Sequence, residues 1–325
     1  MPSDNPFPTT ANRTTLAPSM RDFLSGPGKD LHLGGNEPFT SERRTHQQVL
    51  GIQNIPGGLE VTIGEVEFTA FRGPHGTVPV RVLYPTSGEQ RRKEGKAGAL
   101  IYFHGGGYTV GSVDEFERGL RIVAEESGCQ IYAVDYRLAP EWQFPTQIEE
   151  YIATLKWLRG EAGRARGVDP ALIAGGGDSA GGNMTAAASL WIKDKEEGVE
   201  NLKAQVLLYP EARVPFDTPA AEENNSGYYL VRSACSPPSR HRPHLLALPQ
   251  ECNGIFSFAD HYCPRGTPPS NRYISPGMQP SSSLSALPRA HIFTAGFDPL
   301  RDVGVEYAHK LRAAGNEVGG RTTRS

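Results

Sequence analysis

Hydrophobic and polar positions change their pattern near residue 60 of this 325-residue chain. Up to about residue 58 the sequence is polar and broken by proline and glycine, with two short amphipathic stretches, 20–24 and 42–50. From residue 64 apolar and polar positions alternate over 64–71 and 78–84, which predicts two strands joined by a Gly-Pro-His-Gly turn. We therefore expect a separate N-terminal segment, 1–58, followed by one folded domain, 59–325.

Short apolar, β-branched runs then alternate with helical stretches. We expect strands at 98–103, 130–134, 172–174, 203–209 and 290–295, and helices at 113–126, 147–159, 180–195 and 302–314. Strands that alternate with helices of this length form parallel sheets, because each crossover helix returns the chain to the same edge. The pattern predicts an α/β protein with a mostly parallel, doubly wound sheet.

The periodicity is lost in a mid-chain insertion at about 215–270, and most completely at 233–252. Loops of this length without structure are uncommon in compact domains. We interpret 233–252 as spurious sequence within the insertion, and we assign no role to His241 and His244 inside it.

Composition excludes several classes of function. The net charge of −3, with both signs mixed, gives no basic surface for nucleic acid, and no apolar run is long enough to cross a membrane. The N-terminus lacks the apolar stretch of a signal peptide, so we expect a cytoplasmic protein. The four cysteines match neither a disulfide scaffold nor a zinc site, and no motif calls for a metal or an organic cofactor.

The candidate nucleophile is Ser179. Gly177 to Gly181 read G-x-S-x-G between a predicted strand and a predicted helix, which is the pattern of a nucleophile elbow. Gly177 and Gly181 remove side chains that would clash at such a turn, and the following helix directs its N-terminal amides at the site. Taken alone, the pentapeptide is equally compatible with an ordinary loop between strand and helix.

A second glycine motif favours the catalytic interpretation. The strand at 98–103 ends in His104-Gly105-Gly106-Gly107-Tyr108, a loop of the kind that provides amide donors to an oxyanion. We expect the oxyanion hole to consist of the amides of Gly105, Gly106 and Ala180.

These motifs resemble the hormone-sensitive-lipase-like branch of the α/β-hydrolases. The resemblance covers about residues 59–318 and is carried by HGGGY at 104–108, DYRLAPE at 135–141, GDSAGG at 177–182 and DPLRD at 298–302. It implies the α/β-hydrolase fold, a lid built from the N-terminal segment and the mid-chain insertion, and a small-molecule ester substrate with a small or medium acyl group. It also implies that His104, Gly107 and Asp178 support the motifs rather than react.

Asp298 is the expected acid of the catalytic triad. It follows a strand at the carboxyl edge of the sheet and comes after the serine, as this fold requires. Asp302 is the competitor, but capping of the helix that begins there explains it. For Asp135, Arg137 and Glu141 we expect a buried ion-pair framework that fixes loops.

The base of the triad is missing from the sequence. His309 is the sole histidine after Asp298 and falls in the middle of a predicted helix. We expect the family's histidine to be absent, together with most of the last strand and the last helix, which indicates a C-terminally truncated chain. Three hypotheses follow: a truncated esterase, a small-molecule binding protein on the same fold that has lost catalysis, or an inactive product of a damaged gene model.

Overall fold

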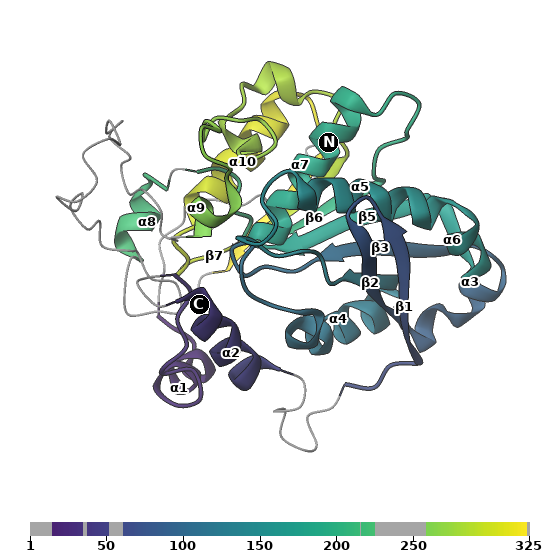
Figure 1. Ribbon diagram of the computed structural model, residues 1–325, viewed down its shortest axis with the longest axis horizontal. Coiled ribbons are helices and arrows are strands. Elements are labelled where there is room, and N and C mark those ends of the chain that lie inside the picture. The colour runs from purple at the N-terminus through teal and green to yellow at the C-terminus, as the bar shows by residue number, and fades with distance from the viewer. Residues whose placement is uncertain (1–14, 35–37, 52–60, 215, 225–257, 324–325) are drawn as a thin grey trace.

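The computed structural model describes residues 15–34, 38–51, 61–214, 216–224 and 258–323 (Figure 1). In these residues eight strands form one sheet in the order β1-β2-β4-β3-β5-β6-β7-β8. The strands are β1 (Glu65–Gly73), β2 (Gly76–Tyr84), β3 (Ala97–Phe103), β4 (Gln130–Val134), β5 (Val168–Asp178), β6 (Ala204–Leu208), β7 (Arg289–Ala295) and β8 (Val318–Thr323). Only β2 runs antiparallel to its neighbours, β1 and β4, so the predicted mostly parallel sheet is confirmed.

Helices cover both faces of the sheet. Figure 1 shows α4 below the sheet, and α5, α7 and α10 above it. The helices are α1 (Pro18–Ser25), α2 (Phe39–Leu50), α3 (Glu89–Lys93), α4 (Val113–Ser127), α5 (Thr146–Arg159), α6 (Glu161–Ala165), α7 (Ala180–Lys195), α8 (Pro219–Glu223), α9 (Phe258–Tyr262) and α10 (Arg301–Ala313). This is the layered, doubly wound architecture that the alternation of strands and helices predicts.

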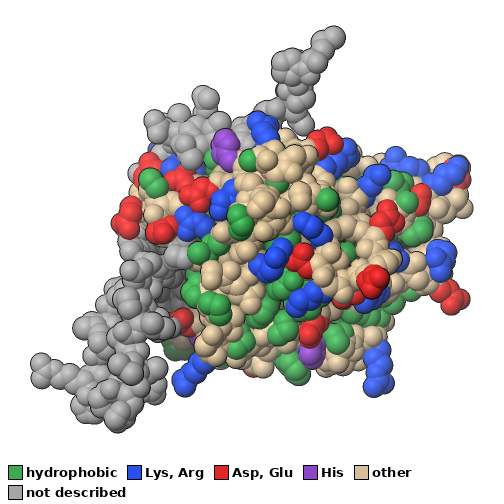
Figure 2. All heavy atoms as spheres, turned by 90° about the horizontal axis from the view of Figure 1, so that it is seen from above, with side chains coloured by type: hydrophobic (Ala, Val, Ile, Leu, Met, Phe, Trp, Pro, Cys, Tyr) green, Lys and Arg blue, Asp and Glu red, His purple; other side chains and the backbone are tan. Residues whose placement is uncertain are grey.

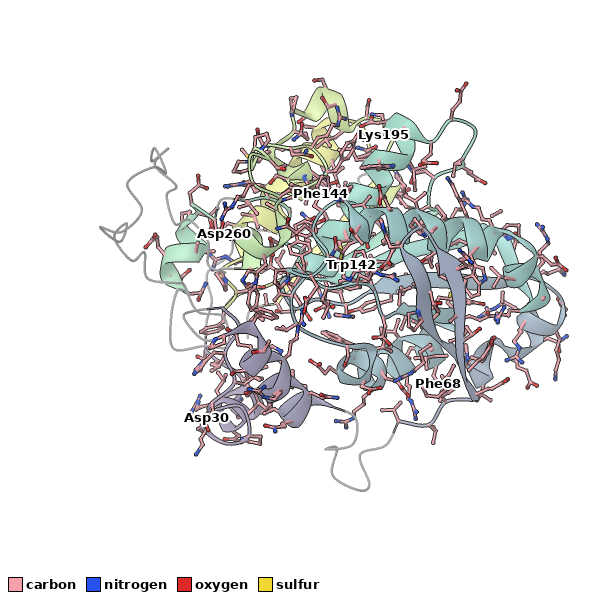
Figure 3. The ribbon with its side chains drawn as sticks, in the orientation of Figure 1. Asp30, Phe68, Trp142, Phe144, Lys195 and Asp260 are labelled. Atoms are coloured by element: carbon pink, nitrogen blue, oxygen red, sulfur yellow. The ribbon has the colours of Figure 1, made fainter. Side chains whose placement is uncertain are left out.

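The central strands are buried on both faces, and their composition explains why. All five residues of β4 are buried, as are six of the seven in β3, including Ile101 and Phe103. A parallel strand with helices on both sides has no polar face, so it appears as a continuous apolar run. The hairpin β1–β2 lies at the opposite edge of the sheet from β8, and its Phe68, labelled in Figure 3, is 74% exposed.

Three features differ from the sequence predictions or lie outside them. The last strand is present: β8 pairs in parallel with β7 from Ala290↔Val318 to Ala295↔Thr323, so the expectation that most of it is missing was wrong. The sequence does not predict this strand, because Gly319 and Gly320 lie within it and glycine has little strand propensity. The segment 233–252 and its two histidines lie outside the described residues.

Two helices of the N-terminal segment lie beside the carboxyl end of the sheet. Figure 1 shows α1 and α2 at the lower left, and Asp30, labelled in Figure 3, marks the connection between them. In the described residues no helix combines the length and the apolar character needed to cross a membrane. Figure 2 shows lysine and arginine interspersed with aspartate and glutamate over the visible face, as the mixed charge of the sequence predicts.

Candidate active site

Ser179 lies between β5 and α7 in a conformation that is rare for a residue with a side chain. Its φ is 52° and its ψ is −118°. The Ser179 amide donates to the Leu208 carbonyl at 2.9 Å, and its own carbonyl accepts from the amides of Asn183 and Glu211. Within the described residues its hydroxyl makes no hydrogen bond, and the residue is 8% exposed. The strained backbone holds a serine hydroxyl above the edge of the sheet.

The two glycines of the motif allow the elbow to pack against β3. A Cβ on Gly181 would overlap the carbonyl oxygen of Phe103, and one on Gly177 would overlap the same oxygen and the backbone of Gly181. Neither glycine has a positive φ. Close approach of two backbones, rather than conformational freedom, is therefore what requires glycine at these two positions.

The glycine loop after β3 lies beside the elbow. Gly106 has φ 104°, which suits glycine, and its amide has no hydrogen-bond partner among the described residues. The amide of Ala180, at the first position of α7, has no intrahelical acceptor because it lies in the first turn. Gly107 has φ 57°, and its amide also lacks a partner within the described chain.

The structure assigns Gly105 another role from the one predicted. Its amide donates to Oδ1 of Asp178 at 2.8 Å, and the Tyr102 hydroxyl donates to the same oxygen at 2.7 Å. Burial raises the pKa of Asp178 to about 6, although these two bonds favour its ionised form. Asp178 thus ties the glycine loop to the elbow, and the Gly105 amide is not available to an oxyanion.

His104 is enclosed by the core. Its Nδ1 lies 2.7 Å from the Gly105 carbonyl oxygen, and its own carbonyl accepts from the Tyr136 hydroxyl at 2.8 Å. The ring stacks with Tyr136 and Phe116, and burial lowers its pKa. These contacts support the structural role that the family resemblance implies.

Asp298 follows β7 at the same edge as the elbow. One carboxylate oxygen accepts from the Leu300 amide at 2.8 Å, and burial raises the pKa of the group to about 7. The competing residue, Asp302, does not cap α10, which begins at Arg301 with Leu300 at the cap position. Its carboxylate instead accepts from Arg301 Nε and from the amide of Ala220 at the start of α8.

The charged residues of DYRLAPE form three separate contacts instead of the single framework we expected. Asp135 accepts from the Val113 amide at the start of α4. Arg137 pairs with Glu150 of α5. Glu141, whose side chain is 50% exposed, pairs with an arginine of α2 and so joins the N-terminal segment to the core.

A cavity of about 560 Å³ opens over these groups. Gly106, Asp178, Ser179 and Asp298 all line it. Most of its remaining wall is apolar and comes largely from the N-terminal segment: Leu16, Ala17, Met20, Phe23, Leu24, Leu31, Leu33 and Leu50, with Phe116, Phe297 and Leu300. The family resemblance implies a lid from the N-terminal segment, but the two weak amphipathic stretches in the sequence do not show which of its side chains line the cavity.

No histidine in the described residues completes the predicted triad. His46 of α2 lines the cavity, but its Nε2 is 3.1 Å from the His32 carbonyl oxygen. His309 is exposed on α10, as its helical position predicts, and His104 is held as described above. Among the described residues there is also no group of three or more histidine, cysteine, aspartate or glutamate side chains placed to hold a metal ion.

Comparison with known proteins agrees with the geometry. Residues 100–324 match the family described as alpha/beta hydrolase fold. Carboxylic ester hydrolase LipN of Mycobacterium tuberculosis is 33% identical over 257 residues, which are 78% of this chain and 61% of LipN, so the chain spans less than two thirds of that relative. Arylesterase of Saccharolobus solfataricus is 30% identical over 300 residues, 92% of this chain and 87% of the relative.

Solved structures point the same way. An esterase of the fungus Rhizomucor miehei matches with a TM-score of 0.79 at 26% identity, covering 95% of this chain and 87% of the fungal one. The hyperthermophilic esterase of Pyrobaculum calidifontis matches with a TM-score of 0.78 at 29% identity, covering 95% and 89%. The family match and these relatives together show that this chain belongs to the α/β-hydrolase family.

Proposed function

We propose that this protein cleaves esters of small or medium acyl groups, with Ser179 as the nucleophile. The observation that carries the proposal is a strained serine at a strand-to-helix turn that lines an apolar cavity. Beside it lie backbone amides that have no hydrogen-bond partner in the part of the chain that the structure describes. The serine oxygen would bond to the ester carbonyl carbon, the alcohol would leave with a proton, and water would then release the acid and restore the serine. The named relatives favour this reaction over the alternative of a non-catalytic binding protein.

The negative charge of the tetrahedral intermediate needs amide donors. Gly106 and Ala180 remain from the predicted set, and the amide of Gly107, which has no partner among the described residues, replaces that of Gly105 as the third candidate. Loss of one such donor costs about 3 kcal/mol of barrier in a well-studied protease.

We propose that Asp298 orients a base carried by a loop after β8, and the position of β8 supports this proposal. β8 runs parallel to β7, and the Gly296 amide donates to the Thr323 carbonyl at 2.8 Å, so the end of β8 adjoins the loop that carries Asp298. A histidine in a loop after Thr323 would emerge at this edge. In serine proteases of the subtilisin type, loss of the base costs about 10⁶ in kcat, while oxyanion donors and binding retain about 10³ to 10⁴ over water.

Labelling with a fluorophosphonate tests the nucleophile. We expect slow labelling that maps to Ser179, is lost in Ser179→Ala, and is kept in Ser282→Ala, which changes an exposed serine. The melting temperature of Ser179→Ala should stay close to that of the parent. Absence of any label, or label that survives in Ser179→Ala, would overturn the proposal.

Supplying the base tests the rest of the site. We expect the 325-residue chain to hydrolyse p-nitrophenyl esters slowly, and a version extended after Thr323 by a loop histidine from a related hydrolase to gain at least about 10²-fold in kcat. The same extension with alanine in place of that histidine is the control. An equal gain in both extended versions would show that added packing, and not the base, limits turnover.

The lid and the location remain predictions. We propose that residues 1–58 and the insertion at about 215–270 cover the cavity, since α1 and α2 line it and α9 packs Tyr262 against Tyr108 of the glycine loop at a ring distance of 3.7 Å. A cytoplasmic location stays a prediction from the sequence.

A further inference from the structure

The glycine loop that carries the proposed oxyanion donors is attached at both of its ends to a buried carboxyl group. At its start, the Gly105 amide donates to Asp178, the residue before the candidate nucleophile. At its end, the Tyr108 hydroxyl donates to Oε1 of Glu211 at 3.3 Å. The donor glycines lie between these two attachments. The catalytic chemistry proposed so far gives Glu211 no role.

The backbone of Glu211 is bound to the turn that holds Ser179. Its amide donates to the Ser179 carbonyl at 3.1 Å, and its own carbonyl accepts from Nδ2 of Asn183 in α7 at 2.7 Å. The residue is 2% exposed. A side chain that is enclosed on all sides and fixed through its backbone has little freedom. Its carboxyl group can therefore hold the Tyr108 hydroxyl at a constant position relative to the nucleophile.

Tyr108 passes this position on to the donor glycines. Its φ of 62° is rare for a residue with a side chain, and its ring stacks on that of Tyr262 in α9. The amides of Thr109 and Val110 both donate to the Gly106 carbonyl, at 3.0 and 2.9 Å, which closes a turn that includes Tyr108. We therefore expect a shift of the Tyr108 side chain to move the glycine amides with it.

The surroundings of Glu211 favour its neutral form. Burial raises its pKa to about 8, although the bond from Tyr108 favours the ionised form. Tyr108, Tyr262 and Cys263 are ionisable groups that interact with it, and burial raises the pKa of each, so all three are also neutral near pH 7. A neutral carboxylic acid accepts a hydrogen bond through one oxygen, as an amide does. Glutamine can therefore replace Glu211 in this contact, whereas leucine cannot.

We propose that Glu211 is a positioning residue for the proposed ester cleavage, acting through the hydroxyl of Tyr108. It holds the amides of Gly106 and Gly107 at a fixed distance from Ser179, where they stabilise the tetrahedral intermediate. Glu211 is not one of the described residues that line the cavity, so it does not act on the substrate directly. Oxyanion donors act mainly on the transition state, so its loss should slow bond formation and leave binding nearly unchanged. This inference deepens the proposed function and rests on it.

The kinetics of fluorophosphonate labelling test this role in the full chain. The dependence of the labelling rate on reagent concentration gives the affinity of the reversible complex and the rate constant of bond formation separately. Glu211→Leu removes the acceptor, and Tyr108→Phe removes the donor. In each we expect the rate constant at Ser179 to fall about tenfold or more and the affinity to stay within about twofold, since a net hydrogen bond corresponds to about this factor.

Two further variants separate the hydrogen bond from a general effect of substitution. Glu211→Gln keeps an acceptor for the Tyr108 hydroxyl, so its rate constant should stay within about threefold of the parent's. Glu126→Leu makes the same change as Glu211→Leu at an exposed position of α4, and should leave both constants unchanged.

Hydrogen exchange gives a second measurement, which needs no reaction at Ser179. The amides of Thr109 and Val110 report on the turn, and those of α7 report on the core; both are followed by mass spectrometry. Glu211→Leu and Tyr108→Phe should speed exchange in the turn by about tenfold while α7 stays protected.

Four results would each overturn the positioning role of Glu211. They are an unchanged rate constant in Glu211→Leu and Tyr108→Phe, an equal loss of rate constant and affinity, a loss in Glu211→Gln as large as in Glu211→Leu, and unchanged exchange in the turn. Absence of label on the unmodified chain would instead overturn the proposed catalysis, and the exchange measurement would still decide whether Glu211 holds the glycine loop.

Discussion

The two sides of the cavity are built in different ways. On the catalytic side, the turn at Ser179 is bound through its backbone to β6 and to the chain that follows it, and its glycines leave no space against β3. On the opposite side, α1 has no buried residue and α2 buries only Glu42 and His46. The proposed catalytic residues therefore lie on the rigid part of the fold, and we expect ligand selection to depend on the helices α1 and α2, which bury few residues.

The largest effect on stability is expected from disturbing the turn at Ser179, on the catalytic side of the cavity. Gly181→Ala places a methyl group on the Phe103 carbonyl oxygen, so the elbow or β3 must move. We expect a loss of about 3 kcal/mol or more in the free energy of unfolding, measured by urea denaturation, with loss of labelling at Ser179. Gly119→Ala is the matched control: it lies exposed on α4 with nothing within 4 Å of an added Cβ, and should stabilise the protein by about 0.5 to 1 kcal/mol. A mild effect of Gly181→Ala would show that the elbow is less constrained than its packing indicates.

A smaller effect is expected from removing the contacts that hold α2 against the rest of the fold. Arg43 of α2 donates to the carbonyls of Thr109 and Ala139 and makes two bonds of 2.7 and 2.8 Å to Glu141. Arg43→Ala should weaken the binding of an ester by about 1 to 2 kcal/mol, because it removes the hydrogen bonds that hold α2 beside the cavity. The melting temperature should change little, because the core of the sheet is left intact.

Arg44→Ala, at the neighbouring exposed position, is the control for that change. Calorimetry and thermal melting of both variants measure the two effects separately. A fall in melting temperature for Arg43→Ala as large as that for Gly181→Ala would mean that both sides of the cavity belong to one cooperative unit.

The smallest expected effect is a dependence of the melting temperature on pH, caused by buried carboxyl groups. Burial raises the pKa of Glu115 and Asp298 to about 7 and that of Glu211 to about 8. Each group binds its proton more tightly in the folded than in the unfolded protein, so its stabilising contribution is lost as the pH rises through the folded pKa. The lowered pKa of His46 and His104 acts in the opposite direction, but only below about 6.5.

We therefore expect the melting temperature to fall by a few degrees between pH 6.5 and 9. Glu211→Gln keeps an acceptor for the Tyr108 hydroxyl and removes the charge, so it should reduce the upper part of this slope. Thermal denaturation of both proteins across the pH range provides the measurement. A melting temperature that rises over this interval would show that these carboxyls ionise freely in the folded protein.

Prediction from the sequence was most successful where the backbone constrains the residue type. The turn at Ser179 needs glycine on both sides for steric reasons, so its motif is visible without a structure. β4 and α7 were predicted at their observed bounds, since each combines a clear apolar pattern with a clear end. β8 was missed because its glycines pair with β7 through their backbones, which leaves little signal in the side chains.

The sequence alone determined the family, the sheet, the candidate nucleophile and its glycine loop, because each depends on local periodicity or on short steric motifs. Only the tertiary structure decided which amides of the glycine loop lack a hydrogen-bond partner within the described residues. The pairing of Gly105 with Asp178 joins residues that are 73 positions apart. It also decided the character of the cavity, since His46 and Glu115 meet across two helices that no local pattern connects. Hydrogen bonding and burial between distant segments are properties of the folded chain, and they determine the chemistry available at this site.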